Sequence, residues 1–206
     1  MLLRIHPDNP NPRELKKVME CLRDGGVIIY PTDTVYGIGC DMYKQKAVER
    51  ICQIKGIKPE KEHFSFLFYD LSQLAAFTKS VDTPIYKLMK KALPGPFTFI
   101  LEANNNIPRF FKNKKKTIGI RIPENNICLE IIKELGNPVM NSSVHDDDEV
   151  VEYTTDPDLI YEKYKKSVDI VIDGGYGNNE ASTVVDCTEG HVTILRQGLG
   201  ILEGYV

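Results

Sequence analysis

The chain has 206 residues, of which 42% are hydrophobic and 27% are charged, and its formal net charge is −3. This composition is typical of a globular domain, so it excludes a disordered, collagen-like or low-complexity chain. The small negative charge also excludes a basic field over the whole surface, which leaves only a local basic patch as a surface for nucleic acid.

The length predicts one domain over residues 1–206, large enough to bury a core without disulfides or a structural metal. No apolar run approaches the ~18–20 residues of a membrane helix, and the N-terminus has no signal-peptide pattern. The five cysteines are scattered and form no C-x-x-C pair, so neither a zinc site nor a disulfide framework is indicated. We therefore expect a cytoplasmic protein with reduced thiols and no membrane contact.

Hydrophobic periodicity predicts helices and strands that alternate along the chain. Apolar stripes at helical spacing indicate the helices, and short apolar runs indicate the strands. In chain order, the expected elements are a helix at 12–22, a strand at 27–30, a helix at 45–54, a strand at 64–69, helices at 71–77 and 85–93, strands at 97–101 and 117–122, a helix at 127–135, a strand at 138–142, a helix at 157–164, and strands at 168–172, 183–186 and 192–195. This alternation is typical of an α/β fold with one large mixed sheet and helices on its faces.

The segment 30–41 has the most unusual composition in the chain. It reads Y-P-T-D-T-V-Y-G-I-G-C-D, follows an apolar strand and precedes a helix, so we expect a loop at the carboxyl end of a strand. Open α/β sheets bind their ligands at that place, and the segment offers hydroxyls, a carboxylate and two glycines. The alternative is an ordinary strand-to-helix turn in which Thr32 or Asp33 caps the backbone locally.

Two groups of cations have unusual surroundings. Lys55 and Lys58 lie beside a glycine and a proline, and a rigid cationic loop of this kind suits a phosphate or a carboxylate. Solvated surface charge is the ordinary alternative for these lysines. Arg121 lies inside an apolar strand, where a charge is costly unless it is paired. An anionic ligand and a structural ion pair explain Arg121 equally well.

Three further polar features carry weaker functional hypotheses. His145 follows a predicted strand and titrates near neutral pH, although a lone histidine is more often structural. The basic run 112–116 could contact an RNA backbone, and the acidic run 146–149 could hold Mg²⁺ through its carboxylates. A solvated turn before a strand is the better explanation of the basic run. The acidic run lacks the ligand spacing and the glycine of a dedicated metal loop, so a dedicated site is not expected there.

Five segments occur in a specific order that spans nearly the whole chain. They are residues 30–41, 93–100 (LPGPFTFI), 117–123 (TIGIRIP), 181–186 (ASTVVD) and 194–198 (ILRQG). Together they resemble the YrdC/YciO family, and the resemblance is closest to the YciO branch. It implies a single YrdC-like α/β domain whose twisted, open mixed sheet has helices on its faces and a large, positively lined concave groove.

The resemblance also implies an activity. The characterised branch of the family makes threonylcarbamoyl-adenylate from L-threonine, bicarbonate and ATP with Mg²⁺, and it releases diphosphate. The product is used to form threonylcarbamoyladenosine in tRNA, and members are also described as binding double-stranded RNA. We therefore expect a threonylcarbamoyl-adenylate synthase-like nucleotidyltransferase. The alternative is a non-catalytic module of the same fold that binds double-stranded RNA or tRNA.

Site residues follow from the resemblance position by position. The family's threonine-binding positions match Thr34, Arg121, Ser143 and Ser182. The nucleotide-binding positions are assigned to Lys55, Lys58, Thr117, His145 and Arg196. Among all of these, the catalytic task of neutralising charge falls to Lys55, Lys58 and Arg121. No residue is expected to ligate a metal, because Mg²⁺ arrives with ATP.

Two positions depart from the active branch of the family. That branch has K-x-R followed by proline, whereas here Ile57 stands at the arginine position counted from Lys55, and Lys58 stands there counted back from the proline. The active branch also has S-x-N, which here reads Ser143, Val144 and His145. These departures favour the binding module, whereas the retained site residues favour the enzyme. A weaker third hypothesis is a nucleotide hydrolase with His145 as its base.

Overall fold

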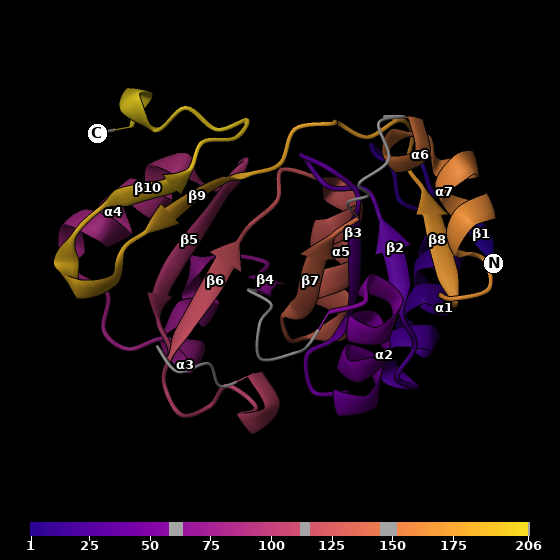
Figure 1. Ribbon diagram of the computed structural model, residues 1–206, viewed down its shortest axis with the longest axis horizontal. Coiled ribbons are helices and arrows are strands. Elements are labelled where there is room, and N and C mark those ends of the chain that lie inside the picture. Colours follow the sequence, from indigo (N-terminus) through magenta and orange to yellow (C-terminus); the bar gives the residue numbers. More distant parts are fainter. Residues whose placement is uncertain (58–63, 112–115, 145–151, 206) are drawn as a thin grey trace.

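The computed structural model describes residues 1–57, 64–111, 116–144 and 152–205 (Figure 1). Two predicted nucleotide-binding residues, Lys58 and His145, lie outside the described residues. The acidic run 146–149 and most of the basic run 112–116 lie outside them as well. The predictions for these positions therefore rest on the sequence alone.

One ten-stranded mixed sheet runs through the molecule in the order β1-β8-β2-β3-β7-β4-β6-β5-β9-β10. The β1–β8, β2–β8, β4–β6 and β5–β9 pairs are parallel, and the other pairs are antiparallel. The strands are β1 Leu2–Arg4, β2 Ile28–Tyr30, β3 Gly37–Asp41, β4 Ser65–Leu67, β5 Phe97–Glu102, β6 Thr117–Arg121, β7 Val139–Ser143, β8 Ile170–Asp173, β9 Thr183–Asp186 and β10 Thr193–Arg196. Figure 1 shows β1 near one end of the molecule and β10 near the other.

Helices flank this sheet and begin at sequence signals that explain their starts. Asn11, Asn125 and Asp156 each accept a hydrogen bond from the first turn of the helix that follows. Gly56 and Gly136 end two helices in the left-handed region, which glycine adopts at little cost. The helices are α1 Pro12–Arg23, α2 Gln45–Lys55, α3 Leu74–Phe77, α4 Thr83–Ala92, α5 Asn126–Leu135, α6 Glu152–Thr155 and α7 Pro157–Tyr164.

Two apolar clusters lie on opposite faces of the sheet. In the first, α1 and α5 pack over one half of the sheet, and alternate residues such as Ile28 in β2 and Ile170 in β8 point into the cluster. In the second, larger cluster, α2, α4 and α7 pack on the other face against residues such as Ile29 and Phe99. The free energy gained by burying these alternating apolar side chains is what mainly fixes the register of the strands.

In strands β4, β6, β5 and β9, one face packs on the larger cluster, and the opposite face carries polar side chains beside apolar ones such as Leu67 and Ile100. We call this opposite face the polar face. Phe99 in β5, and Ile118 and Ile120 in β6, point into the larger cluster. The residues next to them along each strand point the other way, and they include Thr98 in β5 and Arg121 in β6. Side chains alternate across a strand, so these polar groups share the face that is turned away from the larger cluster. That face carries the chemistry described below.

The predicted α/β class and mixed sheet are confirmed, but one prediction in segment 30–41 is wrong. We expected that segment to be a loop, whereas Gly37–Asp41 forms strand β3 between β2 and β7. Its glycines lie against the buried ring of Tyr30, and a Cβ at either position would lie 3.2 Å or less from atoms of that ring. The two glycines therefore serve packing within the sheet, and only residues 31–36 form the loop.

Candidate functional site

Arg121 is the most buried charge on the polar face, with 3% of its side chain exposed. It stands at the carboxyl end of β6, and its Nη2 donates to Asp33 Oδ1 at 2.8 Å and to Thr34 Oγ1 at 2.9 Å. Asp33 is itself nearly buried, with 8% of its side chain exposed. The buried guanidinium is therefore paired, as a charge in a core must be.

These contacts show that the loop at 31–36 lies over the polar face at Arg121. Strands β6 and β2 are separated by β4, β7 and β3. In a flat sheet they would lie about 19 Å apart, which is far more than one arginine side chain spans. The sheet must therefore twist, and the loop at 31–36 must fold over the polar face, for Arg121 to reach Asp33 and Thr34.

Hydrogen bonds hold the loop at 31–36 in a single conformation. Thr32 Oγ1 donates to the carbonyl of Val35 at 2.7 Å and accepts from the amide of Thr34 at 3.0 Å. The Thr32 and Thr34 hydroxyls are 3.2 Å apart, and the single Thr32 proton is already used, so the Thr34 hydroxyl is the donor of that pair. Asn178 anchors the loop from outside by donating to the carbonyls of Asp33 and Thr34, both at 3.1 Å.

A second group of polar side chains lies next to Arg121 on the polar face. Extending the β5–β6 register by one residue pairs Thr98 with Arg121. The Thr98 and Ser182 hydroxyls are 2.8 Å apart, and both side chains are buried. Arg196 Nη2 donates to the carbonyl of Ser182 at 2.8 Å. Burial and the nearby charge of Arg121 lower the pKa of Arg196, so the two cations lie close enough to interact.

The remaining described candidates gather at the other end of β6. Lys55, at the end of α2, donates to Ser142 Oγ and, at 3.2 Å, to the carbonyl of Ser143. Ser65 of β4 pairs with Asn141 of β7 and with Gly119 of β6, and Ser143 and Thr117 lie two residues further toward the same edge of the sheet. Thr117 is four residues from Arg121, or about 13 Å along an extended strand. The structure therefore separates an Arg121 group from a Lys55 group.

Asp33 and Thr98 are functional candidates that sequence reasoning did not place in the site. The sequence offers Asp33 as one polar group of a ligand loop or as a local cap, without a specific role in the site, and it gives Thr98 no role. A buried arginine needs an acidic partner, and Asp33 is the acid inside the most unusual loop of the chain, so that signal was present. Thr98 carried no comparable signal, because threonine is common in strands.

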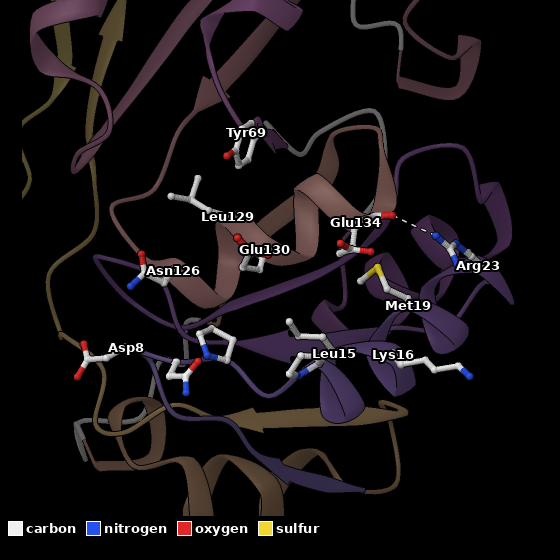
Figure 2. Close-up of a pocket in the computed structure, with 13 residues that line it drawn as sticks. Asp8, Leu15, Lys16, Met19, Arg23, Tyr69, Asn126, Leu129, Glu130 and Glu134 are labelled. Atoms are coloured by element: carbon white, nitrogen blue, oxygen red, sulfur yellow. Dashed lines mark hydrogen bonds between the residues drawn. The ribbon is translucent and has the colours of Figure 1, made fainter.

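A hollow of about 740 Å³ lies elsewhere, between α1, α5 and the segment at 8–12 (Figure 2). Leu15, Met19 and Leu129 supply apolar side chains, and charged residues of both signs surround them. Arg23 Nη2 bridges the two helices by donating to the carbonyl of Glu134 at 3.0 Å. None of the site residues predicted from the sequence lines this hollow.

Two features are absent from the described residues, a metal-binding cluster and a membrane-spanning helix. Within residues 1–57, 64–111, 116–144 and 152–205, no group of three or more His, Cys, Asp or Glu side chains is arranged to hold a metal ion. Among the same residues, no helix is both long and apolar enough to cross a membrane.

Comparison with known proteins identifies the family. A family model described as telomere recombination, and named for Sua5, YciO and YrdC, matches residues 20–198. The chain belongs to the Sua5/YciO/YrdC family. An uncharacterised protein of Haemophilus influenzae is 41% identical over 203 residues, which cover 98% of this chain and 97% of that protein. Escherichia coli YciO is 38% identical over 204 residues, with the same coverage of 98% and 97%.

Solved structures of family members have the same fold. The crystal structure of E. coli YciO matches with a TM-score of 0.91 and 36% identity, over 100% of this chain and 99% of that chain. Pyrococcus abyssi Sua5 complexed with L-threonine matches with a TM-score of 0.86 and 25% identity, over 96% of this chain and 57% of that chain. The P. abyssi threonylcarbamoyl-AMP synthase is 29% identical over 178 residues, 86% of this chain but 52% of that protein.

Proposed function

We propose that this protein is a cytoplasmic threonylcarbamoyl-adenylate synthase of the YciO type. It would use L-threonine, bicarbonate and ATP, release diphosphate, and supply threonylcarbamoyladenosine formation in tRNA. The observation that carries the proposal is the buried Arg121, held by Asp33 and Thr34 where the loop at 31–36 lies over the polar face. Family membership supports it, as does the likeness to a relative whose structure holds L-threonine.

The Arg121 group would bind the amino acid. A guanidinium fixed by two neighbours can pair with the threonine carboxylate through its remaining donors. The Thr34 and Ser182 hydroxyls lie on the same side of the sheet and would bond the amino and hydroxyl groups of threonine. Ser143, at the end of β7 beside Lys55, would complete this set where threonine meets the nucleotide.

The Lys55 group would bind the nucleotide. Lys55 and Thr117, with Lys58 and His145 outside the described residues, would face the phosphates and the base. Arg196 lies beside Ser182 in the Arg121 group and would reach the nucleotide from there. Adenylate formation needs positioning and charge neutralisation more than covalent catalysis, and cations at these positions would supply both. MgATP is the substrate form, because Mg²⁺ is usually held by substrate phosphates and the described residues offer no ligand cluster of their own.

The test is diphosphate release by the purified protein with MgATP and bicarbonate, with and without L-threonine. We expect release that depends on threonine, together with an adenylate product that contains the threonine carbon skeleton. Release at the same rate without threonine would point to the hydrolase hypothesis. Binding of ATP or RNA with no turnover would overturn the synthase proposal.

The second candidate is a non-catalytic module that binds double-stranded RNA or tRNA. The observation that favours it is Ile57 at the position where the active branch has arginine, since isoleucine cannot neutralise a phosphate. An RNA complex held by phosphate contacts should weaken steeply as salt rises, because binding releases counterions. A filter-binding titration over a range of salt concentrations would measure that slope.

The cysteine thiols should be dispensable for turnover. Cys40, Cys52, Cys128 and Cys187 are buried, and burial raises the pKa of Cys187 to about 12. Cys21 is half-buried, and burial together with the charge of Asp169 raises its pKa to about 11. Thiolates react and thiols do not, so labelling at pH 7.5 should be slow and should accelerate only as the pH approaches 11.

The measurement is the labelling of native protein with iodoacetamide at pH 7.5, followed by the turnover assay. Protein unfolded in urea is the control, and all five cysteines should then react. Turnover after labelling should equal that of untreated protein. Loss of turnover in protein that stays folded would show that a cysteine takes part in the reaction.

A further inference from the structure

The ion pair between Asp33 and Arg121 has two atoms without partners. Asp33 Oδ1 accepts from Arg121 Nη2, but within the described part of the chain Asp33 Oδ2 and Arg121 Nε are buried and make no hydrogen bond. The two side chains are 8% and 3% exposed, so both atoms are shielded from bulk water. One atom is an acceptor and the other is a donor, and both belong to the same ion pair.

Unpartnered polar atoms of this kind are costly and uncommon in folded proteins. A buried acceptor or donor without a partner loses the hydrogen bond that it makes to water in the unfolded chain. Other polar groups of the loop do have partners, since the Thr32 and Thr34 hydroxyls bond one another and Asn178 donates to the carbonyls of Asp33 and Thr34. Asp33 Oδ2 and Arg121 Nε therefore lack hydrogen-bond partners at the place where we propose that the substrate binds.

The head group of an α-amino acid complements this pair. Its carboxylate accepts from a guanidinium, and its ammonium group donates to a carboxylate. The charges of Asp33 and Arg121 also sum to zero, so a zwitterion can enter without leaving a net charge on the pair. An α-hydroxy acid of the same shape brings a carboxylate and no ammonium, so it would leave the Asp33 charge without a partner.

We propose that Asp33 binds the α-ammonium group of the amino-acid substrate through Oδ2 while its Oδ1 holds Arg121. Asp33 is then a specificity-determining residue, because it makes the site select zwitterionic α-amino acids over α-hydroxy acids. This inference rests on the proposed function and adds the group that recognises the amine. It gives the carboxylate of the loop at 31–36 a role beyond capping the backbone.

The experiment is calorimetric titration of wild-type protein and of Asp33→Asn with two probes, L-threonine and its α-hydroxy analogue 2,3-dihydroxybutyrate. The wild type should bind threonine at least about tenfold more tightly than the analogue, as expected for one hydrogen bond to a charged group. In Asp33→Asn the threonine Kd should rise by about tenfold or more, while the Kd of the analogue should stay the same or fall.

Asp41→Asn is the matched control. Asp41 is a buried aspartate in β3 whose Oδ1 accepts from the amide of Tyr43 and from Asn137 Nδ2, both at 3.0 Å. The same isosteric change there should leave the ratio of the two affinities unchanged. Thermal unfolding of each variant shows whether it is folded. If Asp33→Asn does not fold, Asp33→Glu takes its place, and it should keep the preference for threonine because it keeps the charge.

The outcomes separate the two proposals. If Asp33→Asn weakens both probes by the same factor, Asp33 only holds Arg121, and this inference is overturned while the synthase proposal stands. If the wild type binds both probes equally, the inference is overturned in the same way. If the wild type binds neither probe, the proposed function fails and the inference fails with it.

Discussion

Arg121→Lys should lower kcat/KM for L-threonine by roughly 100- to 1,000-fold while the protein stays folded. Lysine keeps the positive charge, so the buried carboxylate of Asp33 retains a counter-ion. It loses the planar fork, and one ammonium cannot bond Asp33, Thr34 and a substrate carboxylate in the geometry that the guanidinium allows. Most of the loss should appear in KM, because the interaction removed is one that binds substrate.

Lysine is the informative replacement because alanine would act on stability first. Arg121→Ala would leave the Asp33 carboxylate buried without its partner, which costs about 3–5 kcal/mol of folding free energy. Arg50→Lys is the matched control, since Arg50 Nη1 also pairs with an aspartate, Asp169, at 2.7 Å, but on a more exposed surface. Diphosphate release at varied threonine concentration measures both variants. An unchanged KM in Arg121→Lys would remove Arg121 from the substrate site.

Local signals made several elements predictable from the sequence. The helix at Pro157–Tyr164 agrees with its prediction at both ends, because Asp156 caps it and proline occupies its first position. The strand at Thr183–Asp186 also agrees at both ends. The segment at 71–77 was predicted as one helix, but it divides into a 3₁₀ turn at Leu71–Gln73 and the short helix α3 at Leu74–Phe77.

The order of the strands could not be read from local signals. Strand β1 pairs with β8, and β5 pairs with β9, across long stretches of chain. Such pairings depend on which apolar faces fit together after the chain has collapsed. Strand β1 was missed for the same reason, since a run of three residues, Leu2–Arg4, is extended here because β8 lies beside it.

The sequence indicated individual candidate residues but not how they meet in space. A charge inside an apolar strand pointed to Arg121, and the family resemblance pointed to Thr34 in the unusual loop. Their meeting with Asp33 joins positions that are 88 residues apart in the chain, and it depends on the twist of the intervening strands. For that reason the sequence left ligand and ion pair as equal explanations of Arg121. The structure shows the ion pair, and its unpartnered atoms support the ligand as well.

The glycines of β3 couple the stability of the fold to the site, and Gly39→Ala should lower the free energy of unfolding by about 2–4 kcal/mol. A Cβ at Gly39 would overlap the main-chain oxygen of Met140 and lie 2.8 Å from Tyr30 Oη. Tyr30 Oη donates to Asn141 Oδ1 at 2.7 Å, and Asn141 Nδ2 donates to Ser65 Oγ at 3.0 Å. Displacing the tyrosine would therefore break a buried network that spans β2, β7 and β4.

Gly119→Ala is the control for Gly39→Ala, because Gly119 also lies in a strand, yet its added Cβ would come no closer than 3.3 Å to the Thr98 methyl group. Urea unfolding should give a lower midpoint with an unchanged m value for Gly39→Ala, and a much smaller shift for Gly119→Ala. A Gly39→Ala midpoint equal to that of the wild type would mean that the sheet accommodates the methyl group. Because Tyr30 directly precedes the loop that presents Asp33 and Thr34, the destabilised variant should also bind threonine more weakly.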